Sequence, residues 1–174
     1  MLLSGDAGSG KTTICLKAKP TIFCASEQEP EQIAQAWYRI HGRGIHAPFI
    51  HNVYSWEDLD EDTAHITEDD LLVVDSVSQL AEAHESTKLV KSVIERVRKV
   101  GARAVFIAQF TKAGDMLGPN ELRHQVDVLA TIPNDPTGLR RLAYEKNRFG
   151  SLKGAYFKLG EAGGQSPPHN VSGA

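Results

Sequence analysis

The sequence GDAGSGKT at residues 5–12 constrains this chain more than any other feature. It fits the pattern G-x-x-x-x-G-K-[ST], follows a short apolar run at residues 1–4, and leads into a helix expected over residues 12–19. Between a strand and a helix, this pattern is typical of a phosphate-binding loop, in which backbone N–H groups and the helix dipole form a cradle for phosphate oxygens. We call residues 5–12 the glycine-rich loop.

Each part of this loop has an expected task. The glycines let the backbone curl, Lys11 supplies a positive charge, and the Thr12 hydroxyl is a ligand for the Mg²⁺ that bridges the β- and γ-phosphates. Thr13 is expected to contact the α-phosphate. The predicted nucleotide-binding residues are Gly5, Asp6, Ala7, Gly8, Ser9, Gly10, Lys11, Thr12 and Thr13.

Composition limits the remaining possibilities. A chain of 174 residues with 41% hydrophobic and 24% charged residues suits one globular domain. A net charge of −3 argues against coating nucleic acid by bulk positive charge, although a local basic loop remains open. Cys15 and Cys24 lack metal-ligand or redox spacing, so we expect buried thiols in a reducing, cytoplasmic setting. No stretch approaches the ~18 apolar residues of a membrane span, so no membrane association is expected.

Strand-like runs alternate with helical runs, which predicts an α/β fold with a mostly parallel central sheet flanked by helices. Strands are expected at residues 21–25, 48–53, 71–74 and 104–108, and helices at residues 29–41, 56–65 and 86–100. Ser26 and Pro30 mark the start of the first of these helices and Ser55 the start of the second.

The pattern changes towards the end of the chain. Runs at residues 126–132, 140–146 and 155–159 predict an antiparallel extension, with a hairpin turn at residues 134–138. Residues 160–174 are rich in Gly, Ser and Pro and lack periodicity, so we expect a disordered tail. The predicted domain is therefore residues 1–159.

Polar residues end several of the expected strands. Asp75 follows an apolar strand and is predicted to hold the magnesium shell. Glu27 follows the second strand and is the favoured base for activating water, with Glu29 as the competing candidate because it also suits a capping box with Ser26. Gln109 ends another strand, where it is either a γ-phosphate sensor or a polar loop residue.

Six motifs occur in a recognisable order. They are GDAGSGKT at 5–12, SEQE at 26–29, LLVVDS at 71–76, QFTKAGDMLGP at 109–119, LRHQVD at 122–127 and KNRFG at 146–150. With these motifs the chain resembles, over residues 1–159, the RecA-type ATPase core of the bacterial RadA (Sms) DNA repair family, within the RecA and DnaB superfamily. The resemblance implies a RecA-like P-loop NTPase fold.

The resemblance also implies roles for individual residues. Lys11 and Thr12 would bind phosphate and magnesium, Asp75 would hold magnesium, and Glu27 would activate water. Gln109 would couple the nucleotide state to the segment that follows it, in which Thr111 and Lys112 are candidate DNA contacts. Lys146 and Arg148 of KNRFG would reach the nucleotide site of a neighbouring subunit.

The implied function is Mg²⁺-dependent ATP hydrolysis, stimulated by single-stranded or branched DNA, in a homo-oligomeric ring or filament that serves recombination and repair. RadA proteins also carry a four-cysteine zinc module and a Lon-protease-like domain; neither is in this sequence, so no zinc is expected and ring assembly is open to question. The alternative is a KaiC-like or loader-like regulatory ATPase that assembles on a protein partner. A small-molecule kinase would leave KNRFG unexplained, and a GTPase would need an N-K-x-D motif that this sequence lacks.

Overall fold

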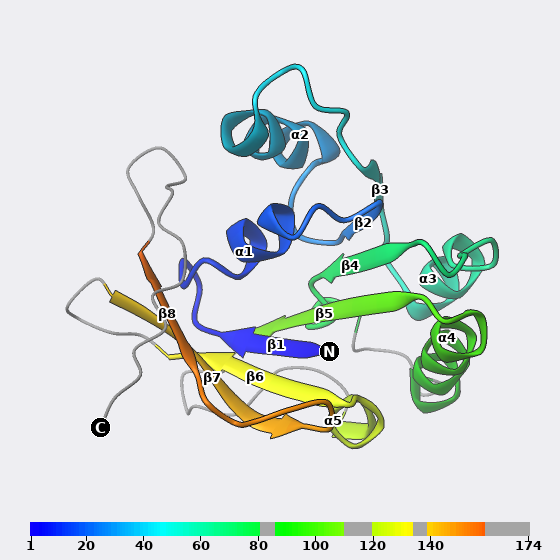
Figure 1. Cartoon of the computed structure of the whole chain (residues 1–174). Helices are drawn as coiled ribbons and strands as arrows, with labels where there is room; N and C mark the ends of the chain where they lie inside the picture. Colours follow the sequence, from blue (N-terminus) through cyan, green and yellow to red (C-terminus); the bar gives the residue numbers. More distant parts are fainter. Residues whose placement is uncertain (81–85, 110–119, 134–138, 159–174) are drawn as a thin grey trace.

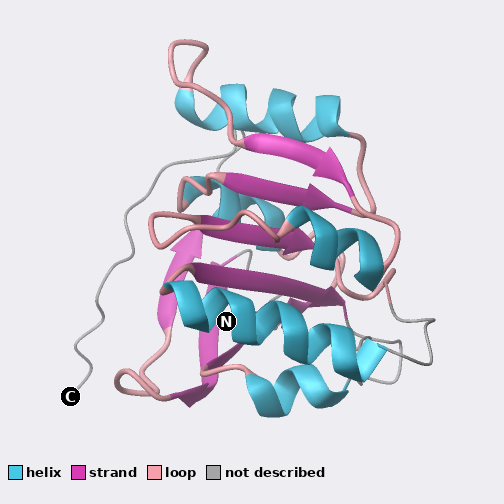
Figure 2. Cartoon of the chain, turned by 90° about the vertical axis from the view of Figure 1, so that its right-hand side faces the viewer, coloured by secondary structure: helices cyan, strands magenta, loops and turns pink. Residues whose placement is uncertain are grey.

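The computed structural model describes residues 1–80, 86–109, 120–133 and 139–158. An eight-stranded sheet with the order β3-β2-β4-β5-β1-β6-β7-β8 lies between two layers of helices (Figures 1 and 2). The strands from β3 to β6 in this order pair in parallel, whereas β7 and β8 pair antiparallel to their neighbours. The expected α/β fold with a mostly parallel sheet is confirmed.

The elements follow one another in the alternation that the sequence predicts. The strands are β1 (Leu2–Gly5), β2 (Ile22–Ala25), β3 (Phe49–Asn52), β4 (Leu71–Asp75), β5 (Arg103–Gln109), β6 (Val128–Ile132), β7 (Leu139–Asn147) and β8 (Ala155–Lys158). The helices are α1 (Lys11–Lys17), α2 (Pro30–His41), α3 (Trp56–Asp62), α4 (Ser86–Val100) and α5 (Asn120–Gln125).

The helices cover both faces of the sheet. Helices α1 and α2 lie on one face and α3, α4 and α5 on the other (Figure 1). Alternate residues of the buried strands point to opposite faces, so that Leu2 and Phe106 pack in the core beneath α3 and α4, whereas Leu3 and Ile107 pack in the core beneath α1 and α2. Burial on both faces explains why these strands are continuous apolar runs in the sequence.

Local chemistry sets where the helices begin and end. Helix α1 stops before Lys19, which has a left-handed φ of 56° and precedes Pro20, a residue that disfavours helical backbone before it. Helix α3 begins at the predicted cap, where the Ser55 hydroxyl accepts a hydrogen bond of 3.0 Å from the Asp58 N–H. It ends at Asp62, three residues before the predicted end, because consecutive acidic residues at 60–62 oppose the helix dipole at its C-terminus.

Helix α2 begins in a different way from the sequence prediction. Its cap is Glu29, which forms a capping box with Gln32, and Pro30 occupies the first turn. The Gln32 side chain accepts a hydrogen bond of 3.1 Å from the Glu29 N–H. Ser26 instead bonds to the backbone of Ser76, so the predicted capping role of Ser26 is wrong.

Two further differences concern the second half of the chain. The run at residues 126–132 was expected to be part of an antiparallel extension, but β6 pairs in parallel with β1 on one side and antiparallel with β7 on the other. The extension therefore begins at β7. Helix α5 was not predicted, because a single polar stretch of six residues, NELRHQ, is too short to show a helical period.

Some expectations lie outside the described residues. They are the hairpin turn at residues 134–138 and the disordered tail at residues 160–174. Among the helices that the structure describes, none is both long and apolar enough to cross a membrane.

Candidate nucleotide-binding site

The parallel strands bring the predicted site residues to one edge of the sheet. Gly5 pairs with Gln109 across β1 and β5, and Ala25 pairs with Asp75 across β2 and β4. The carboxyl ends of these four neighbouring strands therefore carry the glycine-rich loop, Gln109, Asp75 and the segment that contains Glu27. This edge, at the C-terminal ends of parallel strands, is where ligands bind in open α/β sheets.

The glycine-rich loop follows a path that side chains would obstruct. A Cβ atom at Gly5 would lie 2.6 Å from the Ile132 carbonyl oxygen and 2.9 Å from Ser9 Oγ, closer than real contacts allow. Gly8 and Gly10 have left-handed φ angles of 73° and 96°, which favour glycine. Gly10 directly precedes α1, so the loop delivers the chain to the helix N-terminus, where backbone N–H groups are available to an anion.

The buried hydroxyl of Ser9 supports the same interpretation of the loop. Ser9 is only 4% exposed, and its Oγ has no hydrogen-bond partner within the described part of the chain. A buried donor without a partner is costly unless a ligand satisfies it. Phosphate oxygens are suitable acceptors, so the loop fits the group that its sequence predicts.

Lys11 is the cation of the loop. Its ammonium nitrogen donates hydrogen bonds of 2.8 Å to the carbonyl oxygens of Gly5 and Asp6. Burial lowers the pKa of Lys11, and the nearby carboxylates of Asp75, Glu27 and Asp6 oppose this shift. The side chain is thus held at the mouth of the loop among acidic groups.

Thr12 and Asp75 meet at the centre of the edge. The Thr12 hydroxyl donates a hydrogen bond of 2.5 Å to Asp75 Oδ2. Asp75 is 8% exposed, and this burial raises the pKa of its carboxyl group to about 6. The charge of Glu27 also raises the pKa, whereas the hydrogen bond from Thr12 and the charge of Lys11 lower it. Two adjacent oxygens with one carboxylate charge are the ligand type that Mg²⁺ prefers, so these residues fit the predicted metal role.

Glu27 and Gln109 are brought together, which the sequence did not foresee. Gln109 Nε2 donates a hydrogen bond of 2.7 Å to Glu27 Oε2, and the Ser76 hydroxyl donates to Glu27 Oε1. Ser76 was not among the predicted site residues, although its place directly after Asp75 is a usable signal. Because Glu29 caps its own helix, the geometry favours Glu27 as the carboxylate of this site.

Two hydrogen bonds hold the ends of β2 and β4 together beside this cluster. The Ser26 hydroxyl donates to the Ser76 carbonyl oxygen at 2.7 Å and accepts from the Ser76 N–H at 2.8 Å. They fix Glu27 and Asp75, which lie one residue to either side of this pair. The other predicted loop residues, Asp6, Ala7 and Thr13, lie within or directly after the loop, whereas Thr111 and Lys112 lie outside the described residues.

Lys146 and Arg148 lie at the opposite edge of the sheet, where the parallel strands begin. Asn147 pairs with Val128 at the start of β6, whereas Gly5 pairs with Ile132 at its end. Lys146 Nζ donates a hydrogen bond of 2.6 Å to the carbonyl oxygen of Val126, the residue directly after α5. These two cations are therefore held away from the glycine-rich loop of their own chain.

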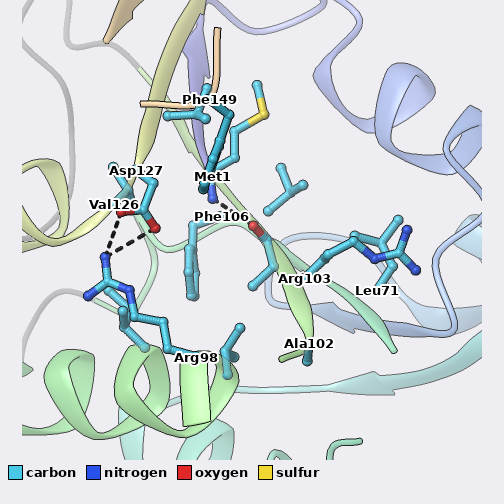
Figure 3. A pocket seen from close by; sticks show the side chains of 14 residues that line it. Met1, Leu71, Arg98, Ala102, Arg103, Phe106, Val126, Asp127 and Phe149 are labelled. Carbon is cyan, nitrogen blue, oxygen red and sulfur yellow. Dashed lines mark hydrogen bonds and ion pairs between the residues drawn. The ribbon is translucent and has the colours of Figure 1, made fainter. Parts of the chain in front are cut away.

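Arg148 is paired with Asp127, which precedes β6. Its guanidinium donates a hydrogen bond of 2.7 Å to Asp127 Oδ1, and its backbone N–H donates one of 3.1 Å to the Asp127 carbonyl oxygen. Arg98 from α4 also donates to this carboxylate, as Figure 3 shows. Burial alone would raise the pKa of Asp127, but the hydrogen bonds and charges of Arg98 and Arg148 hold this pKa below its ordinary value. The Arg148 side chain is 56% exposed and so remains accessible.

A pocket of about 280 Å³ lies at this opposite edge (Figure 3). Its lining includes Val97, Phe106 and Phe149, together with Arg98 and Asp127, which are paired with each other. A mainly apolar hollow does not suit a polyphosphate. The glycine-rich edge remains the candidate nucleotide site.

Comparison with known proteins identifies several bacterial RadA proteins as relatives. The DNA repair protein RadA of Chlamydia pneumoniae is 29% identical over 193 aligned residues, which cover 99% of this chain and 42% of the relative. The RadA proteins of Bacillus subtilis and Escherichia coli are 29% and 28% identical, each covering 87% of this chain and 36% of the relative. The chain is related to the bacterial RadA proteins.

The RadA relationship agrees with the resemblance that the six motifs indicate. The chain spans about two fifths of the length of these RadA relatives. No protein-family model matches the sequence. The alignment with the Chlamydia pneumoniae protein covers 99% of this chain, so it spans both the glycine-rich loop and the KNRFG motif of this chain.

The raised pKa of Asp75 leads to a prediction for stability. In the unfolded chain its carboxyl group has a pKa near 3.8, whereas in the fold the value is about 6. Between these values the native state binds more protons than the unfolded state, so Asp75 makes the ligand-free fold less stable as pH rises from about 4 to 6. Replacing Asp75 by Asn should remove this loss and raise the free energy of unfolding at pH 7 by about 1 to 3 kcal/mol.

Urea unfolding of wild type and Asp75→Asn at pH 4 and pH 7, without Mg²⁺ or nucleotide, provides the measurement. The two proteins should have similar stability at pH 4, because Asp75 is then largely protonated in the fold. A variant that is less stable than wild type at pH 7 would contradict the assigned effect of burial.

Proposed function

We propose that this chain is a RecA-type, Mg²⁺-dependent ATPase that acts on single-stranded or branched DNA in recombination and repair. The observation that carries the proposal is the gathering of Lys11, Thr12, Asp75 and Glu27 at one edge of the sheet, beside a glycine-rich loop whose backbone path leaves no space for a side chain at Gly5. The name of the relatives, DNA repair protein RadA, supports the biological setting.

Different residues of the site would bind the phosphates and the metal ion. The backbone of the glycine-rich loop and the first turn of α1 offer N–H donors, and Lys11 is positioned to exchange its bonds to Gly5 and Asp6 for phosphate oxygens. Thr12 and Asp75 would hold Mg²⁺, which when bound neutralises charge on the β- and γ-phosphates. The Thr12 hydroxyl must then turn its oxygen lone pairs from Asp75 towards the metal.

Glu27 is the proposed base for water. It is exposed to solvent, and both of its oxygens accept one hydrogen bond, from Ser76 and Gln109, which leaves lone pairs for a water proton. These two donors fix the carboxylate without protonating it. A positioned base of this kind contributes about 10² to 10⁴ in rate.

Gln109 is the proposed link between DNA and hydrolysis. It bonds to Glu27 and directly precedes residues 110–119, to which the RadA resemblance assigns DNA contact through Thr111 and Lys112. A shift of Gln109 would change the orientation of Glu27 through a single hydrogen bond. DNA binding would thereby alter the rate of the chemical step.

The proposed assembly is a homo-oligomeric ring or filament in which Lys146 and Arg148 act on a neighbour's nucleotide. Arg148 would leave Asp127 and place its guanidinium near the γ-phosphate across the subunit boundary, where such arginine fingers accelerate hydrolysis by ~10³ or more. The exposed position of Arg148 permits this exchange of partners.

The central test is ATP turnover by the whole chain with Mg²⁺, measured with and without single-stranded and branched DNA. We expect turnover that DNA increases, and Lys11→Ala should abolish it while retaining the wild-type circular dichroism spectrum. Turnover that DNA leaves unchanged, together with a partner-dependent increase, would favour the regulatory ATPase instead. Undiminished ATP affinity in Lys11→Ala would contradict the phosphate-binding role.

The base is tested by a matched pair of variants. Glu27→Gln should retain ATP binding and lose about 10²- to 10⁴-fold in turnover, because the amide cannot accept the water proton. Glu29→Gln is the control, since Glu29 caps α2 and should affect stability more than rate. If Glu29→Gln shows the rate loss and Glu27→Gln does not, the two roles are reversed.

The assembly is tested by mixing two inactive variants. Arg148→Ala retains an intact glycine-rich loop and Lys11→Ala retains an intact KNRFG turn, so their mixture should recover part of the turnover that each lacks. Asp127→Asn is the control, because it removes the same ion pair but keeps the guanidinium. Equal rate losses in Arg148→Ala and Asp127→Asn, without recovery on mixing, would show that the ion pair only supports the fold.

A further inference from the structure

A second cluster of ligand-type side chains lies far along the sheet from β1, between β2, β3 and α3. Cys24 Sγ lies 3.3 Å from His51 Nε2, and His51 Nδ1 lies 2.9 Å from Asp62 Oδ2. Cys24 and His51 are paired residues in the parallel register of β2 and β3, so their side chains share one face of the sheet. Asp62 ends α3, which covers that face.

This cluster does not suit a nucleophilic enzyme site. Cys24 is fully buried, so a substrate larger than a water molecule or a single ion cannot approach its sulfur. Burial, with a smaller contribution from the charge of Asp62, raises the pKa of the Cys24 thiol. A thiol in this setting is a weak nucleophile, although a bound cation can still displace its proton.

The geometry suits a metal ion better. With zinc–sulfur and zinc–nitrogen bonds of ~2.3 and ~2.0 Å at a tetrahedral angle, sulfur and nitrogen would be about 3.5 Å apart. The observed 3.3 Å differs by only a few tenths of an ångström. One ligand atom from each of Cys24, His51 and Asp62 lies within 4.8 Å of the others.

The position of Asp62 matches the usual partner of a metal-bound histidine. Imidazoles that bind metals commonly donate their other ring N–H to a carboxylate, which fixes the tautomer and the ring orientation. Asp62 accepts from Nδ1 and leaves Nε2 directed to Cys24. A Cys24 thiolate and the Asp62 carboxylate also supply two negative charges, which balance a divalent cation.

We propose that Cys24 and His51 directly bind a zinc-class divalent cation between β2 and β3, with Asp62 orienting His51. On binding, the Cys24 S–H bond breaks, its proton passes to solvent, and a sulfur–metal bond forms without any redox change. The side chains of His51 and Asp62 are 19% and 30% exposed, which gives water and the ion a path to the remaining positions. The site is separate from Thr12 and Asp75 and does not depend on the proposed ATPase function.

The alternative is a hydrogen-bonded relay, in which the thiol donates to Nε2 and Nδ1–H donates to Asp62. Both arrangements use the same contacts, so only metal binding separates them. Cobalt(II) is the suitable probe, because a cobalt–thiolate bond gives charge-transfer absorption that oxygen ligands do not.

The experiment titrates the whole chain, stripped of metal and nucleotide, with Co²⁺ and then with Zn²⁺ in competition. Wild type should show thiolate absorption with one ion per chain, which Zn²⁺ displaces and a large excess of Mg²⁺ does not. Cys24→Ser should lose this absorption, and Asp62→Asn should weaken the affinity about 10- to 100-fold. Cys15→Ser is the matched control, because Cys15 is also a buried free cysteine but lies in the core on the other face of the sheet.

Two outcomes would overturn the proposal. Wild type without thiolate absorption would show that the cluster is only a relay, and this result needs no variant to fold. Absorption that persists in Cys24→Ser but disappears in Cys15→Ser would place the metal elsewhere. Circular dichroism of each variant, and an unchanged absorption in Asp75→Asn, complete the controls.

Discussion

The parallel register of β2, β4, β5 and β1 is the constraint on which the site depends. It aligns the last residues of four strands, so that Glu27, Asp75, Gln109 and the glycine-rich loop meet although they are distant in sequence. The close approach of Gly5 to the Ile132 carbonyl oxygen ties this edge to β6 as well. The candidate site residues at this edge lie at the ends of buried strands or directly after them, and a buried strand leaves them little freedom to move.

Charge at this edge bears on how the proposed phosphate ligand and metal ion would bind. Asp75, Glu27 and Asp6 carry three potential negative charges around one ammonium, that of Lys11. A free polyphosphate would meet repulsion there, whereas its magnesium complex brings the missing positive charge. Burial of Asp75 has the same implication, because a carboxyl group whose pKa is raised to about 6 by desolvation is stabilised as an anion when a cation takes its proton's place. We therefore expect nucleotide and metal to bind together.

Sequence reasoning succeeded where a local pattern determines the outcome and failed where pairing between distant segments decides it. The glycine-rich loop, the Ser55 cap and the strand that ends in Asp75 each follow from a few adjacent residues. The preference for Glu27 over Glu29 depends on the contact of Gln32 with the α2 N-terminus, and the contact of Gln109 with Glu27 spans 82 positions. A single sequence also does not predict the parallel pairing of β6 with β1 or the register that places Cys24 beside His51. An apolar run indicates a buried strand but not the strand with which it pairs.

The separation of the two predicted halves of the ATPase constrains any assembly. The glycine-rich loop lies at the carboxyl edge of the parallel strands, and Arg148 lies at the opposite edge, fixed there by the antiparallel pairing of β6 with β7. If Arg148 serves a neighbouring nucleotide, one edge of each chain must face the other edge of the next. A two-fold dimer satisfies this requirement only if one surface of the chain spans both edges, because residue i of one copy then contacts residue j of the other and the reverse. If the two edges form two separate contact surfaces, the contact is head-to-tail, and a repeated head-to-tail contact either closes into a ring or continues as a filament. The proposed ring or filament therefore requires that the glycine-rich loop and Arg148 belong to two separate contact surfaces.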